Sequence, residues 1–237
     1  MKKACVKLLT VTMCFALLLS MGSLAARQAS GDFEPIESRI SKFMSDNKLN
    51  DGNFSFSYYN TVTGETFGFN EDKMMRVGSV YKLPLNMYYY EQVALGAISP
   101  NARFAGYPLS QCHMLSLRDS DNSTSQAMRQ AIGGLSAFKI AIDKYTGVSA
   151  AEIGGDYLHS NQFSSMTIMN TLKYLYDNSE FFSEALGYLK AANPRQFFKM
   201  YVEDYEIAQK YGWLDMWPQP GSSTRRSRIC FVWPLSA

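Results

Sequence analysis

The first residues whose types and spacing could support catalysis are Ser79 and Lys82, a serine and a lysine three positions apart. On a helix, positions i and i+3 share a face, so the Lys82 amine is expected beside the Ser79 hydroxyl. A lysine whose pKa is lowered by burial can accept the hydroxyl proton and make the serine nucleophilic.

The two histidines, His113 and His159, are too few and isolated for a metal site, and both are expected on the surface or in loops.

Two further short motifs follow in the chain. Ser120-Asp121-Asn122 begins 41 residues after Ser79, and Lys210-Tyr211-Gly212 comes near the end. Each motif alone is weak, because a serine followed three residues later by a lysine occurs about once by chance in such a chain. The three motifs in this order are a much stronger signal.

Hydrophobic periodicity predicts the elements that must position these motifs. A hairpin precedes a long apolar helix that starts at Ser79, and a helical block follows before the third motif. We therefore expect a sheet that begins near the N-terminus and resumes near the C-terminus. Helices are predicted over 33–44, 79–95, 123–132, 135–145, 164–176 and 181–191, strands over 53–59 and 65–69, and a loop over 147–162.

With these motifs in this order, the chain resembles the penicillin-recognising serine hydrolases, and among them the class A β-lactamase-like branch. The resemblance covers roughly residues 33–215. It implies an α+β fold, in which an antiparallel sheet from both chain ends is flanked by helices. An all-helical subdomain is expected at about residues 96–195, within a hydrolase domain of residues 27–216.

The resemblance also implies a role for each motif residue. The nucleophile lies at the start of a buried helix, where the helix dipole favours an ionised oxygen. Ser79 is then the acylated nucleophile, Lys82 the proton acceptor, Ser120 the bridge toward the leaving nitrogen, and Asn122 the group that holds Lys82 and the substrate amide.

The third motif is implied to bind substrate through Lys210, Gly212 and the following Trp213. Lys210 supplies positive charge for a substrate carboxylate, and the backbone N–H groups of Ser79 and Trp213 form an oxyanion hole. Tyr211 departs from the family pattern, which has a small hydroxyl residue there. This departure places binding of the substrate carboxylate in question.

The family's deacylating glutamate has no clear counterpart. Asp156 is the candidate for this base, with a solvated loop acid as the alternative interpretation. Without such a base, attack of water on the acyl-enzyme is expected to be slow, because a positioned base contributes about 10²- to 10⁴-fold.

The expected function is therefore that of a serine hydrolase acting on β-lactams through an acyl-serine, with no cofactor and no metal. One alternative is a D-Ala-D-Ala peptidase or penicillin-binding protein that deacylates slowly, with a peptidoglycan stem peptide as substrate. Another is a non-catalytic relic that binds the cell wall.

The first 26 residues resemble a secretory signal, with lysines before an apolar stretch and small residues at its end. The stretch is too short for a comfortable membrane span, so secretion to the cell envelope is favoured over an uncleaved anchor. Without this segment the chain has 20 basic and 21 acidic residues, and no nucleic-acid partner is expected. Cys112 and Cys230 would remain, and Cys112 is expected to be a small buried residue.

Residues 217–237 form an aberrant tail in which a basic run replaces the expected strands. We interpret the hydrolase domain as truncated or frame-shifted here, because one permitted choice of codons for residues 220–237, read from the third base, encodes two strands around an acidic turn. Residues 229–233 are expected to form at most one makeshift strand. The predicted consequence is a poorly folded or inactive product.

Overall fold

The computed structural model describes residues 34–193, 196–200, 206–214 and 227–235. The predicted signal segment, and residues 217–226 and 236–237 of the predicted tail, lie outside the described residues. The chain divides into two units, residues 1–52 and 53–237, and each is considered by itself. In the first unit, α2 (Ile36–Asp46) is an amphipathic helix with no buried residue.

Two hairpins supply the strands on which the fold of the second unit depends. β1 (Phe56–Tyr59) and β2 (Thr66–Phe69) pair antiparallel close to where the sequence predicted a hairpin. β7 (Glu206–Leu214) pairs antiparallel with β8 (Ser227–Leu235) along nine residues. Among the described residues these hairpins are separate two-stranded sheets, as are β3 (Met75–Arg76) with β6 (Gln162–Phe163), and β4 (Arg103–Phe104) with β5 (Tyr107–Pro108).

The strand predicted within the tail is present, and it is longer than expected. The sequence suggested residues 229–233, whereas β8 runs from Ser227 to Leu235 and provides a ladder partner for all of β7. The backbone N–H and C=O groups of β7 that face β8 therefore have hydrogen-bonding partners.

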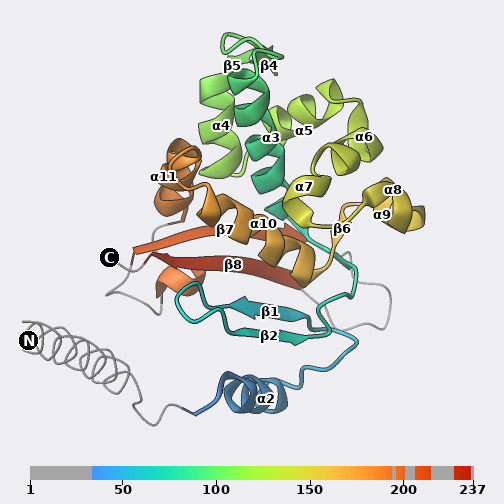
Figure 1. The fold of residues 1–237 in the computed structure, drawn as a ribbon, viewed down its shortest axis with the longest axis vertical. Helices are drawn as coiled ribbons and strands as arrows, with labels where there is room; N and C mark the ends of the chain where they lie inside the picture. The colour runs from blue at the N-terminus through green and yellow to red at the C-terminus, as the bar shows by residue number, and fades with distance from the viewer. Residues whose placement is uncertain (1–33, 194–195, 201–205, 215–226, 236–237) are drawn as a thin grey trace, which may run out of the picture. The chain divides into compact units, whose positions relative to one another are not determined.

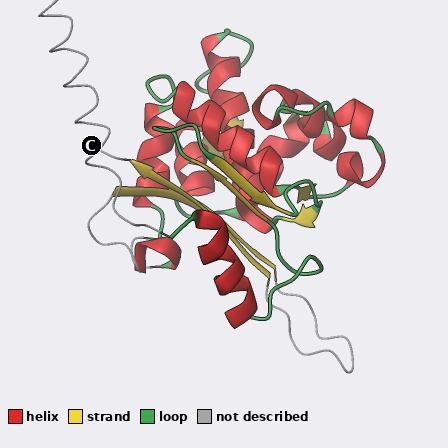
Figure 2. Ribbon diagram, turned by 60° about the horizontal axis from the view of Figure 1, so that its bottom comes forward, coloured by secondary structure: helices red, strands yellow, loops and turns green. Residues whose placement is uncertain are grey.

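Helices are the main secondary structure among the described residues of the second unit. Figures 1 and 2 show the β7–β8 pair along one side of the helical block, and α11 and η1 pack on β7. The helices are η1 (Gly78–Tyr81), α3 (Lys82–Ala94), α4 (Leu109–Leu117), α5 (Asn122–Ala131), α6 (Gly134–Ala141), α7 (Asp143–Thr146), α8 (Ala150–Ile153), α9 (Gly155–His159), α10 (Ser165–Asp177), α11 (Ser183–Ala191) and η2 (Phe197–Met200). No helix among the described residues is long and apolar enough to cross a bilayer.

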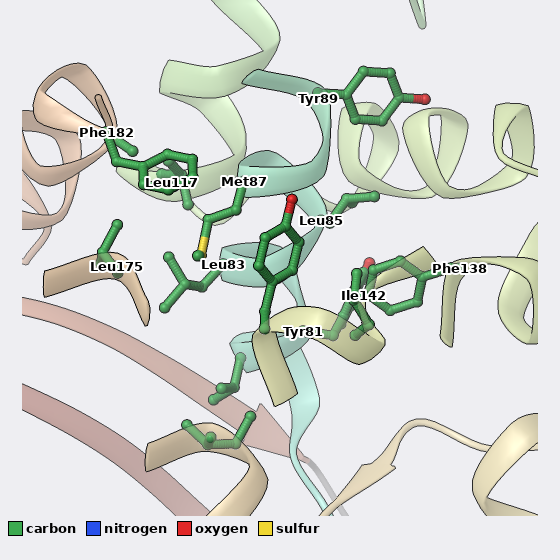
Figure 3. Packing of buried hydrophobic residues seen from close by; sticks show 14 of the residues in the cluster. Tyr81, Leu83, Leu85, Met87, Tyr89, Leu117, Phe138, Ile142, Leu175 and Phe182 are labelled. Atoms are coloured by element: carbon green, nitrogen blue, oxygen red, sulfur yellow. The ribbon is translucent and has the colours of Figure 1, made fainter. Parts of the chain in front are cut away.

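Helix α3 lies at the centre of the core. Its side chains Leu83, Leu85 and Met87 are almost fully buried, and they meet side chains from the surrounding helices (Figure 3). Lys82 and Asn86 on the same helix are also fully buried. Buried polar groups are nearly always hydrogen-bonded, so this apolar helix must carry a polar network.

Helix α4 was not predicted from the sequence. Its buried residues have helical spacing, but His113 and Ser116 interrupt the apolar pattern among Leu109, Cys112 and Leu117. The expectation that His113 lies at the surface is wrong, because its side chain is only 3% exposed. Cys112 is buried, as expected.

Candidate active site

Ser79 lies in the 3-10 turn η1, directly before α3. The turn requires Gly78 at φ 55°, a left-handed conformation that glycine adopts without strain. Ser79 is half-buried between the buried residues Gly78 and Val80. The sequence predicted Ser79 in the first turn of an α-helix, and the structure places it in a 3-10 turn that leads into one.

Lys82 is fully buried, and its ammonium group reaches the second motif. Nζ donates to Asn122 Oδ1 at 2.7 Å and to the Ser120 carbonyl at 2.5 Å, and it lies 3.4 Å from Ser120 Oγ. Burial lowers the pKa of Lys82 to about 8, although the nearby Asp121 carboxylate acts in the opposite direction. Such an amine can lose its proton near neutral pH and act as a base.

The Ser120 hydroxyl lies between two lysines. Lys210 Nζ donates to Ser120 Oγ at 2.8 Å, a shorter contact than the 3.4 Å from Lys82 Nζ. Ser120 has φ 58°, a left-handed conformation that is costly for a residue other than glycine. The hydroxyl proton remains available for donation, because both ammonium groups can only donate to its oxygen.

Asp121 serves a structural purpose in the second motif. It is the N-cap of α5, and its carboxylate accepts from Thr124 N at 2.7 Å and from Thr124 Oγ1 at 2.8 Å. Burial acts to raise the pKa of Asp121, but these hydrogen bonds and nearby Lys82 bring it below its usual value. The cap sets the start of α5 and so places Asn122, the first residue of that helix.

Gly212 brings β7 against the nucleophile turn. A Cβ atom at this position would lie 1.9 Å from the Val77 carbonyl oxygen and 2.9 Å from Ser79 N. Only glycine permits such a close approach of two backbones. Since Trp213 follows at once in the strand, the approach supports the predicted pairing of its amide with that of Ser79, while the Trp213 side chain lies outside the described residues.

Tyr211 occupies the position where the family pattern has a small hydroxyl residue. Its ring stacks on Phe197 of η2, with centroids 4.8 Å apart and planes inclined by 26°. Lys210 Nζ lies 4.7 Å from the centroid of the same ring. The ammonium predicted to bind a carboxylate thus also faces an aromatic ring, which is a favourable cation–π geometry.

Asp156 is not brought together with the other predicted site residues. It is exposed on α9, and its carbonyl accepts from Ser160 Oγ at 2.5 Å. Within the described part of the chain, the Asp156 carboxylate has no hydrogen bond or ion pair with Ser79, Lys82 or the second motif.

Asn161 touches the nucleophile turn, although the sequence did not single it out. Its carbonyl accepts from Val77 N at 3.2 Å, and its amide donates to the Gly78 carbonyl at 2.8 Å. Its Oδ1 is buried without a partner among the described residues. In the sequence, Asn161 is one of many polar residues in the predicted 147–162 loop, and nothing local marks it.

Another buried lysine, Lys139 on α6, was not among the predicted site residues. Its Nζ donates to the Gln162 carbonyl and lies 3.6 Å and 3.3 Å from the ring centroids of Tyr157 and Phe163. Burial lowers the pKa of Lys139 from its ordinary 10.5 to about 7. The lysine fastens the segment that follows Asn161 to the helical block.

The buried Lys139 predicts a specific dependence of stability on pH. Between about pH 7 and 10.5 the unfolded chain binds a proton that the native Lys139 does not, so stability should rise with pH in this window. From pH 6 to pH 9 the parent is expected to gain about 2–3 kcal/mol more than Lys139→Met, measured by urea unfolding. Equal gains would contradict this, because all other titrating groups are common to both proteins.

The comparisons with known proteins identify the family. A family model described as the beta-lactamase enzyme family, Beta-lactamase2, matches residues 35–225. The chain belongs to this family. It is thus a serine hydrolase of the β-lactamase type. A search of curated proteins finds no match.

Solved structures show that the fold is that of class A β-lactamases. The last common ancestor of Gram-negative bacteria class A β-lactamase matches with a TM-score of 0.63 at 17% identity, over 82% of this chain and 84% of that one. A variant of that ancestor, bound to 5(6)-nitrobenzotriazole as a TS-analog, matches with a TM-score of 0.62 at 15% identity, over 83% and 84%. A β-lactamase from Chitinophaga pinensis matches with a TM-score of 0.56 at 16% identity, over 68% and 73%.

Proposed function

We propose that this β-lactamase-family chain is a secreted hydrolase that opens β-lactam rings through an acyl-enzyme on Ser79. One observation carries the proposal: Lys82 and Lys210 converge on the hydroxyl of Ser120, next to the turn that holds Ser79. This arrangement combines a nucleophile, a base of lowered pKa and a hydroxyl available for proton transfer. β-Lactam hydrolysis by this chain would contribute to antibiotic resistance.

In the proposed acylation, the Lys82 amine accepts the proton of Ser79, and Oγ attacks the carbonyl carbon of the ring. The amides of Ser79 and Trp213 stabilise the negative charge that develops on the carbonyl oxygen. The ring C–N bond then breaks, and the Ser120 hydroxyl donates a proton to the leaving nitrogen. Lys82 can return the proton to Ser120, because its Nζ lies 3.4 Å from that hydroxyl oxygen.

Substrate binding in this proposal relies on Lys210 and Asn122. Lys210 offers charge to a carboxylate, and Asn122 offers its amide N–H to a substrate carbonyl while its Oδ1 accepts from Lys82 at 2.7 Å. The Tyr211 ring beside Lys210 competes for the ammonium, so we expect weaker binding of the carboxylate than a small hydroxyl residue would support.

A second function, that of a penicillin-binding protein or D-Ala-D-Ala peptidase, is favoured by the position of Asp156. Asp156 is the deacylation base proposed from the sequence, and its exposed side chain does not reach the described cluster. In this function the chain would form the acyl-enzyme with a β-lactam or a stem peptide and release it slowly.

Replacing Asp156 with asparagine tests the assigned base. We expect the lifetime of the acyl-enzyme to change by less than about two-fold, because a base must contact the attacking water to contribute 10²–10⁴-fold. The lifetime is measured by mass spectrometry after a pulse of penicillin, with exposed Glu152→Gln on the neighbouring α8 as the matched control. A 100-fold longer lifetime in Asp156→Asn alone would assign the base to Asp156 and favour hydrolysis.

Turnover and labelling distinguish the candidate functions. Nitrocefin hydrolysis with a transient adduct on Ser79 supports the hydrolase, and a stable penicilloyl adduct supports the penicillin-binding protein. A folded chain that shows neither is the non-catalytic relic, and an adduct that persists in Ser79→Ala contradicts the assigned nucleophile.

Secretion is a separate part of the proposal. It rests on the signal-like residues 1–26, which lie outside the described residues. N-terminal sequencing of the protein exported by a bacterial host should show cleavage close to residue 26. Retention of the full-length chain in the cytoplasm would contradict secretion without affecting the chemistry.

A further inference from the structure

Three buried polar side chains join the backbone of Lys82 to the backbone of the second motif. Asn86, one turn after Lys82 on α3, donates through Nδ2 to the Lys82 carbonyl at 2.6 Å and to Ser116 Oγ at 2.8 Å. Ser125 Oγ lies 2.9 Å from Ser116 Oγ and donates to the Asp121 carbonyl at 2.6 Å. We call Asn86, Ser116 and Ser125 the polar bridge; all three are fully buried.

The protons of the polar bridge have a single consistent arrangement. The Asp121 carbonyl can only accept, so it takes the one hydroxyl proton of Ser125. The hydroxyl of Ser116 must then donate to Ser125, while it accepts from Asn86. Both N–H groups of Asn86 are used, one on Ser116 and one on the Lys82 carbonyl. A network in which every donor is paired holds its members more rigidly than one with gaps.

His113 fixes the orientation of the Asn86 amide. Asn86 Oδ1 lies 2.8 Å from His113 Nδ1, and because this oxygen can only accept, Nδ1 carries the proton. The imidazole stacks on the Tyr90 ring, with centroids 3.9 Å apart. Burial lowers the pKa of His113 to about 3, so the ring stays neutral whenever the protein is assayed near neutral pH.

We propose that the polar bridge is a positioning device for acylation, which holds the Lys82 ammonium in register with Ser120 and Asn122. This inference rests on the proposed function, in which Lys82 is the base. The bridge ends on the carbonyl of Lys82 and on the carbonyl of Asp121, the residue between Ser120 and Asn122. It therefore spans the two backbone segments whose separation determines the contacts of Lys82.

The conformation of Ser120 gives a reason for such a device. A non-glycine residue at φ 58° persists only where the surrounding structure holds it. The polar bridge restrains the next carbonyl in the chain, and the Asp121 side chain restrains the start of α5. Loss of the bridge is expected to loosen the turn and to admit water to the Lys82 amine.

The burial of Lys82 and the charged groups around it determine in which direction its pKa changes when the polar bridge is lost. Burial disfavours the ammonium form of Lys82 and the Asp121 carboxylate favours it, while the Lys210 ammonium lies nearby as a donor to Ser120 Oγ. His113 is neutral and contributes no charge. Because burial is the main cause of the lowered pKa of Lys82, hydration of the amine must raise that pKa.

The test uses Asn86→Leu, which removes the polar bridge and keeps a side chain of similar size. The Lys82 titration is followed by NMR on the full chain with isotope-labelled lysine, and Lys82→Met assigns the signal. We expect the pKa of Lys82 to rise by about one unit. Labelling of Ser79 by a fluorescent penicillin should fall about 10- to 100-fold, the scale expected for a misplaced base.

Two further variants keep the inference falsifiable. Thr171→Val removes another buried hydroxyl, which donates to the Thr167 carbonyl at 2.9 Å on α10, and should leave the Lys82 titration unchanged. Ser125→Ala breaks the bridge at its other end and should shift the Lys82 titration in the same direction. It takes the place of Asn86→Leu if that variant does not fold. An unchanged Lys82 titration in folded bridge variants would overturn the inference. A parent chain that neither hydrolyses nitrocefin nor is labelled by penicillin would refute the proposed function, while the NMR titration of Lys82 would still test the bridge.

Discussion

Replacement of Lys82 by methionine is expected to slow acylation of Ser79 by about 10²- to 10⁴-fold, the usual contribution of a positioned general base. The expectation follows from the buried amine, whose pKa is lowered to about 8, and from its contacts with Ser120 and Asn122. Methionine fills a similar volume but cannot accept a proton. The rate of labelling by a fluorescent penicillin measures the effect.

The pH profile distinguishes loss of the base from general damage. Because the neutral amine is the reactive form, the acylation rate of the parent should rise with pH through about 8 and then level off. The Lys82→Met variant should lack this rise.

Lys139→Met is the matched control, since it removes another fully buried lysine, whose Nζ donates to the Gln162 carbonyl and not to the second motif. It should keep the rise of the acylation rate with pH, because Lys82 is still present. A pH rise that persists in Lys82→Met, with acylation undiminished, would show that another group takes the Ser79 proton.

Replacement of Gly212 by alanine is expected to cost about 100-fold in acylation and about 1–3 kcal/mol in the free energy of unfolding. The added Cβ would lie 1.9 Å from the Val77 carbonyl oxygen and 2.9 Å from Ser79 N, and both are backbone atoms that cannot turn away. β7 must therefore move from the nucleophile turn, and Lys210 and the Trp213 amide must move with it. Acylation kinetics and urea unfolding of the same preparations measure both effects.

Gly187→Ala is the matched control for this substitution. Gly187 lies within α11, and a Cβ there meets no atom within 4 Å. Because alanine is the better helix former, the control should be more stable than the parent by about 0.5–1 kcal/mol. Parental acylation and stability in Gly212→Ala would show that β7 does not lie against Ser79 in solution.

Much of the fold could be predicted from local patterns. The hairpin β1–β2 and helices α3, α5, α10 and α11 follow alternation or helical spacing of apolar residues, which depends on neighbours within one or two turns. Helix α4 was not predicted because two of its buried residues, His113 and Ser116, are polar. Their hydrogen-bonding partners, Asn86 and Ser125, come from other helices. Such polar core positions cannot be distinguished from surface positions without knowledge of the tertiary contacts.

The sequence by itself determined which chemical groups are available. The family and the chemistry could be predicted from the order and spacing of the motif residues Ser79, Lys82, Ser120, Asn122 and Lys210, because residue types and spacing can be read directly from the chain. Only the tertiary structure decided how these groups meet. It directed the Lys82 amine to the second motif, left Asp156 exposed, and joined α3 to α5 through buried hydroxyls. These outcomes depend on contacts between residues up to 90 positions apart, such as Lys210 with Ser120, and on burial that changes the pKa of an amine. Neither the distances nor the burial are encoded in local spacing.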